Sequence, residues 1–182
     1  MVFVLDASRS VTEKNFGLMR QFVKNFLSNA DVDGGNVRVG VMIYSNDVNI
    51  QFHLNEHTTK SDVFAAVDAI PYTEGSTNTA KALKVMRTEM FRAINGDRPK
   101  TDNIAIVITD GYATQDEDQI IPEAEISHNA GIHIFSIGIG LADLAELDSL
   151  ASKPVSENRF AVENFGKLDE LAKRVFDGFC SK

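Results

Sequence analysis

The sequence is short of the residues that several classes of protein need. It has one cysteine, four prolines and no tryptophan, and none of its apolar runs approaches the roughly 18 residues that span a bilayer. Runs of lysine and arginine with interleaved aromatic residues are also missing, and the net charge of −8 would repel nucleic acid phosphates. We therefore expect neither membrane insertion nor nucleic acid binding. The 182 residues, 43% hydrophobic and 24% charged, have the balance of one globular domain.

The two ends of the sequence suggest how this domain relates to a longer chain. Strand-like sequence begins at once with "MVFVL", which lacks the basic start of a secretory signal. We therefore expect residues 1–182 to be a single domain excised from a larger protein. The only cysteine, Cys180, is close to the other end. It is either a buried spare thiol or half of a disulfide whose partner lies outside this chain, and the second reading implies an oxidising compartment.

Apolar runs alternate with amphipathic segments along the whole chain. We expect strands at 2–6, 103–111, 132–140 and 159–162 and a two-stranded hairpin within 36–54, with helices at 12–30, 58–70, 79–94, 117–130, 143–152 and 166–179. Thr12 and Thr59 are expected helix N-caps, the latter in a capping-box-like arrangement with Asp62. The alternation predicts a doubly wound, Rossmann-like α/β fold. Its six-stranded sheet would be mostly parallel, with one antiparallel edge strand and helices on both faces.

Acidic and hydroxyl side chains follow the ends of these strands. The first predicted strand runs into "DASRS" and the central one ends in "ITDG", while the segment 73–83, "TEGSTNTAKAL", is rich in glycine and hydroxyls. In open α/β sheets, ligands bind beyond the carboxyl ends of the strands. If the two strands are neighbours, five side chains would converge there: Asp6, Ser8, Ser10, Thr77 and Asp110.

All five of these side chains offer oxygen, and two of them carry formal charge, which is a set that hard divalent cations prefer. The hydroxyls would leave the ion incompletely neutralised, so that it could accept a carboxylate from another molecule. Each piece alone has a simpler explanation. Ser and Asp at a strand-to-helix turn usually cap the helix, and Asp-Gly commonly marks a turn. The combination favours a metal site because chain order, strand-end position and ligand type agree.

The residues "DASRS", the Thr of "GSTNT" and the Asp of "ITDG" together resemble the metal-ion-dependent adhesion site of von Willebrand factor type A domains. The resemblance extends over the chain through "VFVLDASRSV", "RVGVMIYS", "TNTAKAL", "IAIVITDG", "GIHIFSIGIG" and "FDGFC". Within the family, "DASRSV" and the terminal "FC" look most like matrilins and non-fibrillar collagens such as type VI. The resemblance implies an extracellular matrix module that adheres to a protein partner.

Carried over to this sequence, the resemblance implies a role for each candidate ligand. Ser8 and Ser10 would bind the cation directly, and Thr77 directly or through water. Asp6 and Asp110 would act largely through coordinated water. The cation would be Mg²⁺ or Mn²⁺, with Ca²⁺ as an alternative, and a Glu or Asp of a matrix protein such as collagen would complete its coordination.

The resemblance also concerns the cysteine and the place where the protein acts. In matrilin-like modules, a cysteine before the first strand pairs with one after the last helix. The resemblance therefore implies that Cys180 pairs with a cysteine outside this chain, in a secreted protein of the extracellular matrix.

The same residues allow two other functions. A Mg²⁺-dependent phosphoryl-transfer enzyme would use a strand-end Asp as nucleophile, but it usually adds a Lys and a second acid beside it, and Asp6 is followed by Ala7 and Ser8. We therefore do not expect an enzyme. An acidic module that binds mineral or calcium is a further alternative. We expect His53 and His57 to lie on the solvated surface rather than in a zinc site, and His133 to be a satisfied core histidine.

Overall fold

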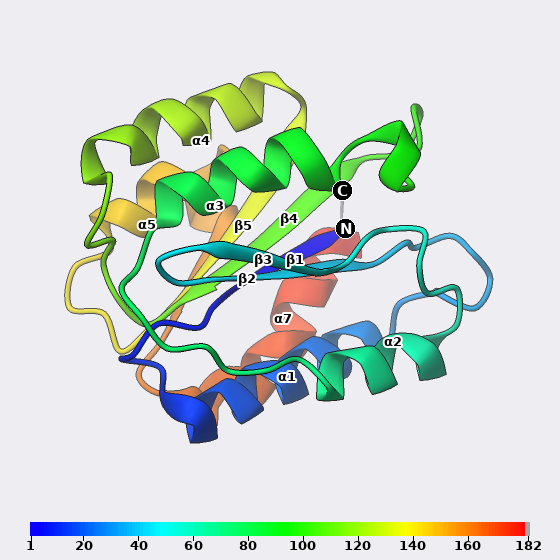
Figure 1. Cartoon of the computed structure of the whole chain (residues 1–182), viewed down its shortest axis with the longest axis horizontal. Helices are drawn as coiled ribbons and strands as arrows, with labels where there is room; N and C mark the ends of the chain where they lie inside the picture. Colours follow the sequence, from blue (N-terminus) through cyan, green and yellow to red (C-terminus); the bar gives the residue numbers. More distant parts are fainter. Residues whose placement is uncertain (181–182) are drawn as a thin grey trace.

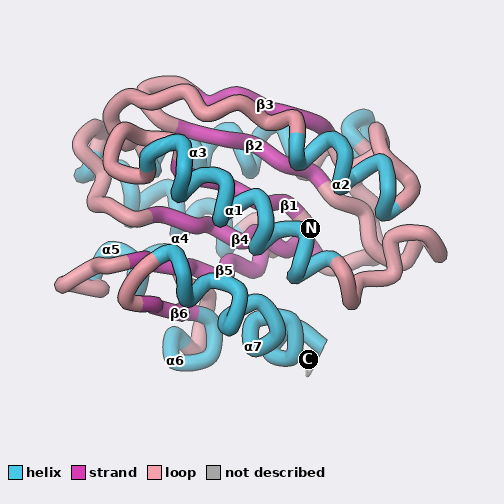
Figure 2. The backbone as a smooth tube through the Cα atoms, turned by 90° about the horizontal axis from the view of Figure 1, so that it is seen from below, coloured by secondary structure: helices cyan, strands magenta, loops and turns pink. Residues whose placement is uncertain are grey.

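The computed structural model describes residues 1–180, with side chains up to Phe176, so the thiol of Cys180 lies outside the described residues. Six strands form one sheet in the order β3-β2-β1-β4-β5-β6 (Figure 2). They are β1 (Val2–Asp6), β2 (Gly40–Tyr44), β3 (Val48–Phe52), β4 (Asn103–Thr109), β5 (Ile132–Ile139) and β6 (Arg159–Val162). Every neighbouring pair is parallel except β2 with β3, which places an antiparallel strand at one edge. The predicted fold class is confirmed.

Helices cover both faces of this sheet (Figure 1). One face carries α1 (Thr12–Leu27), α2 (Lys60–Asp68) and α7 (Leu168–Cys180), and the other carries α3 (Thr79–Val85), α4 (Ile120–Asn129) and α5 (Ala145–Leu150). Shorter turns are α6 (Val155–Asn158), η1 (Met86–Met90), η2 (Ala93–Asn95), η3 (Glu117–Gln119) and η4 (Phe165–Lys167). Within the described chain, no helix combines the length and apolar character needed to cross a membrane.

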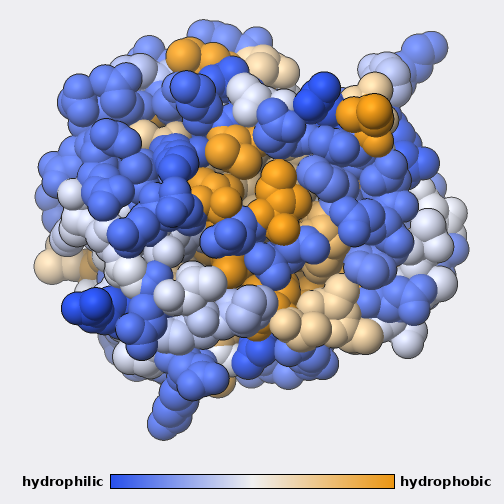
Figure 3. Space-filling view, viewed as in Figure 1, coloured by the Kyte–Doolittle hydropathy of each residue, from blue (hydrophilic) through white to orange (hydrophobic). Residues whose placement is uncertain are grey.

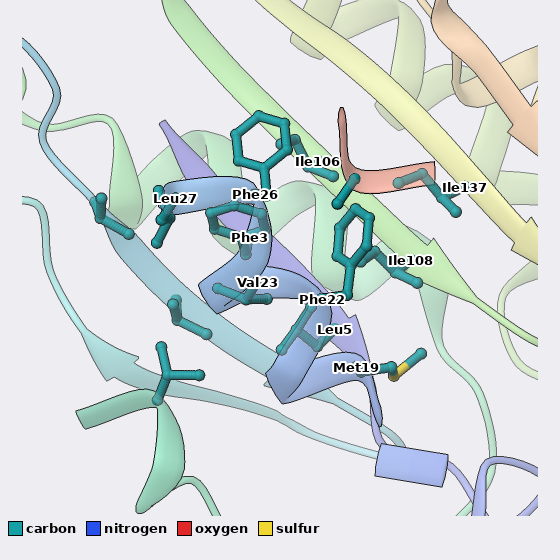
Figure 4. Close-up of a cluster of buried hydrophobic side chains, with 14 of the residues drawn as sticks. Phe3, Leu5, Met19, Phe22, Val23, Phe26, Leu27, Ile106, Ile108 and Ile137 are labelled. Atoms are coloured by element: carbon teal, nitrogen blue, oxygen red, sulfur yellow. The ribbon is translucent and has the colours of Figure 1, made fainter. Parts of the chain in front are cut away.

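Strand β1 is buried on both faces and holds two hydrophobic cores apart. Phe3 and Leu5 pack into the core below α1 and α7, whereas Val2 and Val4 belong to the core on the α3 and α4 side (Figure 4 shows the first of these cores). The ring of Phe3 meets Phe26 of α1 edge-on, with centroids 5.6 Å apart. Burying a side chain of this size stabilises the fold by about 1.5–3 kcal/mol. The end of β1 is therefore a rigid support for the residues that follow it.

The edge strand β3 is more exposed than the central strands. Its side chains Val48 and Ile50 are half-buried against the core on the α3 side. Figure 3 shows hydrophobic residues near the centre of the face seen in Figure 1, with hydrophilic residues over most of the surface around them.

The two expected helix caps have different outcomes. The hydroxyl of Thr59 accepts a hydrogen bond from the backbone N–H of Asp62 at 3.1 Å, which confirms this N-cap. The expectation for Thr12 is wrong. Val11 precedes the helix without a side-chain cap, and Thr12 itself has a φ of 66°. An N-cap needs extended backbone, but here the chain enters the helix from a turn that the Val11 N–H closes on the Ser8 carbonyl at 3.2 Å.

The predicted helix over 79–94 is also interrupted. Regular α-helix ends at Val85 and continues as one π-turn from Met86 to Met90. Both methionines remain fully buried. The methyl of Met90 lies 2.7 Å from where a Cβ of Gly40 would stand, so the wider turn depends on the missing side chain at that position of β2. A periodic pattern alone does not distinguish the two helix types.

Candidate metal centre

Three segments meet at the carboxyl end of the central strands. Because β1 and β4 are parallel neighbours with Leu5 beside Ile108, Asp6 and Asp110 emerge at the same edge of the sheet. The segment before α3 reaches this edge too, where the carbonyl of Gly75 accepts a hydrogen bond from the Arg9 N–H at 2.9 Å. The convergence expected from the strand ends is thus present in the fold.

A chain of hydrogen bonds joins four of the five predicted ligands. One carboxylate oxygen of Asp6 accepts the backbone N–H of Ser8 at 2.8 Å. The hydroxyls of Ser8 and Ser10 lie 3.2 Å apart, and Ser10 donates its proton to Asp110 at 2.7 Å. A hydroxyl that gives its proton to a carboxylate keeps its lone pairs free for a cation. The side chains are therefore held in the protonation pattern that an oxygen-ligated metal needs.

Thr77, the fifth predicted ligand, lies on the segment between α2 and α3 and faces Ser8 and Ser10 across a pocket. It lines this pocket of about 450 Å³ together with Ser8 and Ser10. Its backbone is fixed because its N–H donates to the Thr114 hydroxyl at 3.1 Å and its carbonyl accepts from the N–H groups of Thr114 and Gln115. Among the described residues, nothing bonds to the Thr77 hydroxyl, which leaves this oxygen available to a ligand.

Burial of the two carboxylates is poorly compensated. Burial raises the pKa of Asp6 to about 6, and the nearby charge of Asp110 adds to this rise. The hydrogen bonds from Thr109 and Ser8 lower the pKa but do not cancel the effect of burial. Burial also raises the pKa of Asp110, although the bond from Ser10 opposes it. In the described part of the chain, neither forms an ion pair with a lysine or arginine. A bound cation would supply the missing positive charge.

Two residues that support this site were not predicted, although one of them had a signal. Thr109 donates its hydroxyl proton to the second carboxylate oxygen of Asp6 at 2.6 Å, so both oxygens of Asp6 are held. The parallel register pairs Leu5 with Ile108 and so places Thr109 beside Asp6. The signal was the position of Thr109 directly before Asp110 at the end of the predicted central strand, although aligning the two strand-end Asp residues would have set Asp110 beside Asp6. Tyr72 donates to the Ser8 carbonyl at 2.9 Å from 64 residues away, and no local pattern predicts it.

A second polar cluster lies behind the first. Glu146 of α5 accepts the Ala113 N–H at 3.0 Å and the Thr79 hydroxyl at 3.2 Å, and burial raises the pKa of its carboxyl. The Tyr44 hydroxyl is fully buried near Thr79 and Thr109 but has no hydrogen bond of normal geometry among the described residues. Burial, with the charge of Asp6 next, raises the pKa of this phenol well above its usual value.

The histidines are not part of this centre. His133 shares a 2.8 Å hydrogen bond with the Asn158 amide oxygen, as expected for a satisfied core histidine. His53 and His57 are half-buried rather than solvated, because the ring of His57 packs edge-on against Phe52 with centroids 4.9 Å apart. No three His, Cys, Asp or Glu side chains gather in the described region to hold a metal.

The oxygen donors at the carboxyl end of the central strands are of the chemical type that a hard divalent cation prefers. The set consists of hydroxyl and carboxylate oxygens, without the thiolate or imidazole groups that soft metals prefer. Its carboxylates lack basic partners among the described residues, and its hydroxyls are oriented by hydrogen bonds to them.

Comparisons with known proteins agree with this reading. The family model of the von Willebrand factor type A domain matches residues 1–174. Matrilin-1 of Gallus gallus is 33% identical over 99% of this chain, and the Collagen alpha-4(VI) chain of Mus musculus is 31% identical over 100% of it. The chain spans only 36% and 8% of these relatives, respectively. Among solved structures, one that matches is proximal thread matrix protein 1 from the mussel byssus, with a zinc-occupied MIDAS motif. The TM-score is 0.90 and the sequence identity 27%, and the match covers 98% of this chain and 47% of the mussel chain.

Proposed function

The chain belongs to the von Willebrand factor type A domain family, and we propose that it is an adhesion module that holds a protein partner through a divalent cation. The observation that carries this proposal is the unbroken chain of hydrogen bonds from Asp6 through Ser8 and Ser10 to Asp110. It orients hydroxyl oxygens toward one pocket beside carboxylates that have no basic partner in the described chain. The family assignment favours binding over catalysis.

Each residue of the centre has a proposed part in holding the ion. Ser8 and Ser10 would offer their hydroxyl oxygens directly, and Thr77 would do so directly or through water. Asp6 and Asp110 would neutralise the ion, largely through water that they hold. We propose Mg²⁺ or Mn²⁺ as the resident cation, with Ca²⁺ as the alternative. When bound, the cation supplies an electrophilic position that a Glu or Asp carboxylate of the partner can occupy.

The setting proposed for this activity is the extracellular matrix. The relatives are matrilins and a type VI collagen chain, and the similar mussel structure is also a matrix protein by name. We propose that the chain is one secreted module of a larger matrix protein, that Cys180 pairs with a cysteine outside it, and that the partner is another matrix protein such as collagen.

A titration tests the cation site directly. Calorimetry with Mg²⁺, Mn²⁺ and Ca²⁺ should give one site in the native chain, and Thr77→Ala should lose it because a free ligand oxygen is removed. The matched control is Thr58→Ala. This exposed threonine lies at the amino end of the central strands, away from the proposed site, and the variant should bind cations like the native chain. Capture of partners from a matrix extract should then require the cation and stop with EDTA.

Three results would contradict this proposal. Cation binding by Thr77→Ala equal to that of the native chain would exclude the predicted centre. EDTA-insensitive capture would show that the partner binds elsewhere. Binding of several Ca²⁺ ions that Thr77→Ala leaves unchanged would favour the acidic surface, and thus mineral or calcium binding, as the function.

A further inference from the structure

The pocket beside the predicted ligands has an uneven chemical lining. Its walls carry hydroxyl and amide side chains, with Gly75 between them, and Arg9 is the one charged residue that lines it within the described chain. A volume of about 450 Å³ is of the size that holds a ligand or a few side chains of a partner. The cation site proposed above would occupy one part of this pocket, and Arg9 lies at another.

The backbone of Arg9 is fixed although its side chain is exposed. The N–H of Arg9 donates to the Gly75 carbonyl at 2.9 Å, and the carbonyl of Arg9 lies 3.4 Å from the Tyr72 hydroxyl. The neighbouring wall is also tied down, because the Asn46 amide oxygen accepts from the Ser76 N–H at 2.6 Å and from the Ser76 hydroxyl at 2.9 Å. The guanidinium therefore projects from a defined point beside the pocket.

The guanidinium of Arg9 makes no hydrogen bond among the described residues. Six of the eight arginines of the sequence donate from their guanidinium groups to carboxylates or backbone carbonyls: Arg20, Arg38, Arg87, Arg92, Arg98 and Arg159. Among the described residues, Arg9 and Arg174 make no such bond. Arg9 forms no ion pair with Glu74 or Asp110 either, although the chain carries a net charge of −8. A free guanidinium beside a ligand pocket is a ready binding group for an anion.

We propose that Arg9 makes this pocket selective for polypeptide segments that carry two acidic side chains close together. One carboxylate would complete the coordination of the cation, and the second would pair with the planar guanidinium of Arg9. This inference rests on the proposed function, because the first carboxylate requires the cation site. A polyanionic glycan fits less well, since the surrounding surface of an acidic domain would repel its further charges.

The test uses fluorescent Gly/Ser peptides that contain Glu-Gly-Glu, Glu-Gly-Gln or Gln-Gly-Glu, measured by anisotropy at saturating Mn²⁺. The native chain should bind the two-glutamate peptide about fivefold more tightly than either single-glutamate peptide, as expected for one partly exposed ion pair. Arg9→Gln should reduce this preference to the about twofold or less that two equivalent carboxylates give by statistics alone. Arg174→Gln, which removes the same charge from α7, should keep the native preference. Calorimetry should give Arg9→Gln an affinity for Mn²⁺ no lower than native, because a positive charge beside the cation has been removed.

The outcomes separate this inference from the proposed function. If the single-glutamate peptides bind in a Mn²⁺-dependent way but Arg9→Gln keeps the preference for two glutamates, the role of Arg9 is overturned and the cation site stands. If no peptide shows Mn²⁺-dependent binding, both fail. Binding of a heparin oligosaccharide that depends on Arg9 and survives EDTA would overturn the polypeptide assignment in favour of a glycan.

Discussion

The two ends of the central sheet use the same kinds of side chain in opposite ways. At the amino end, Arg38 donates to the Gly96 carbonyl at 2.7 Å, and Arg98 donates to the carbonyls of Gly35 and Asn36 at 2.8 and 2.7 Å. These arginines tie loops together and leave few donors free. At the carboxyl end, Arg9 makes no comparable bond among the described residues, and carboxylates are buried without cations beside them.

Burial of charge carries an energetic cost at both ends. At the amino end it lowers the pKa of the Met1 ammonium, which donates to the Arg38 carbonyl at 2.7 Å, to about 5, and at the carboxyl end it raises the pKa of the Asp6 carboxyl to about 6. Natural proteins accept such locally unfavourable groups mainly where a ligand will later compensate them. Asp6 is linked to the proposed binding site by its bond to Ser8, which lines the pocket at the carboxyl end.

The largest expected effect comes from removing the charge of Asp6 at the carboxyl end of the central strands. Asp6→Asn should lower divalent cation affinity by about 100-fold or more, because the ion loses a negative charge beside it. The same change should raise the free energy of unfolding of the metal-free protein at pH 7 by about 1–3 kcal/mol. The new amide can accept from Ser8 and donate to Thr109, whose own proton can go to the Gly111 carbonyl 3.0 Å away. Calorimetry and urea unfolding measure both quantities.

The pH dependence of stability checks the same carboxyl. Because the folded pKa of Asp6 is raised above its unfolded value of about 3.8, the folded state holds the proton more tightly. Asp6 should therefore contribute a fall in the stability of the metal-free protein as pH rises from about 4 to about 6, and Asp6→Asn should remove this fall. Asp110 and Glu146, whose pKa values burial also raises, contribute in the same direction, whereas the Met1 ammonium, whose pKa burial lowers to about 5, makes stability rise with pH above about 5. Asp102→Asn, an exposed control at the amino end, should keep the native slope and cation affinity.

An intermediate effect is expected at the amino end. Arg98→Met keeps the apolar part of the side chain but removes two hydrogen bonds to loop carbonyls, so urea unfolding should show a loss of about 1–2 kcal/mol. Cation affinity should not change. Arg92→Met, which breaks only an exposed pair with Glu89, should stay within about 0.5 kcal/mol of the native chain. A weaker cation site in Arg98→Met would show that the two ends are coupled.

The smallest effect is expected at Tyr44, behind the carboxyl end. Its buried hydroxyl has no hydrogen bond of normal geometry in the described structure, so Tyr44→Phe should change the free energy of unfolding by less than about 1 kcal/mol, in the stabilising direction. Tyr72→Phe makes the same chemical change at a hydroxyl that donates to Ser8, and it should destabilise by about 1 kcal/mol. A larger loss in Tyr44→Phe than in Tyr72→Phe would refute the assignment of an unused hydroxyl.

What the sequence predicted depended on how local each signal is. Buried strands that end in Asp6 and Asp110 are visible as apolar runs, and the alternation of strands and helices leads to the sheet that brings them together. Tyr72 reaches the centre from the loop after α2, and Glu146 reaches it from the start of α5, and single-sequence patterns do not encode such distant contacts. The prediction that Thr12 is an N-cap was wrong because a hydroxyl before a helix suggests a cap without regard to the backbone conformation. The φ of 66° at Thr12 depends on the preceding turn, which the sequence pattern does not show.

The hydrogen bonds that hold Asp6, Ser8 and Ser10 have an entropic consequence. Side chains that are already fixed lose little rotamer freedom when a ligand arrives, whereas each loose one would cost about 0.5–1.5 kcal/mol to immobilise. Such a frame adapts poorly to ions of different radius. Mg²⁺ demands near-ideal geometry, while Ca²⁺ accepts variable and more numerous oxygens. A rigid set of few donors at the proposed site would therefore discriminate between cations by size.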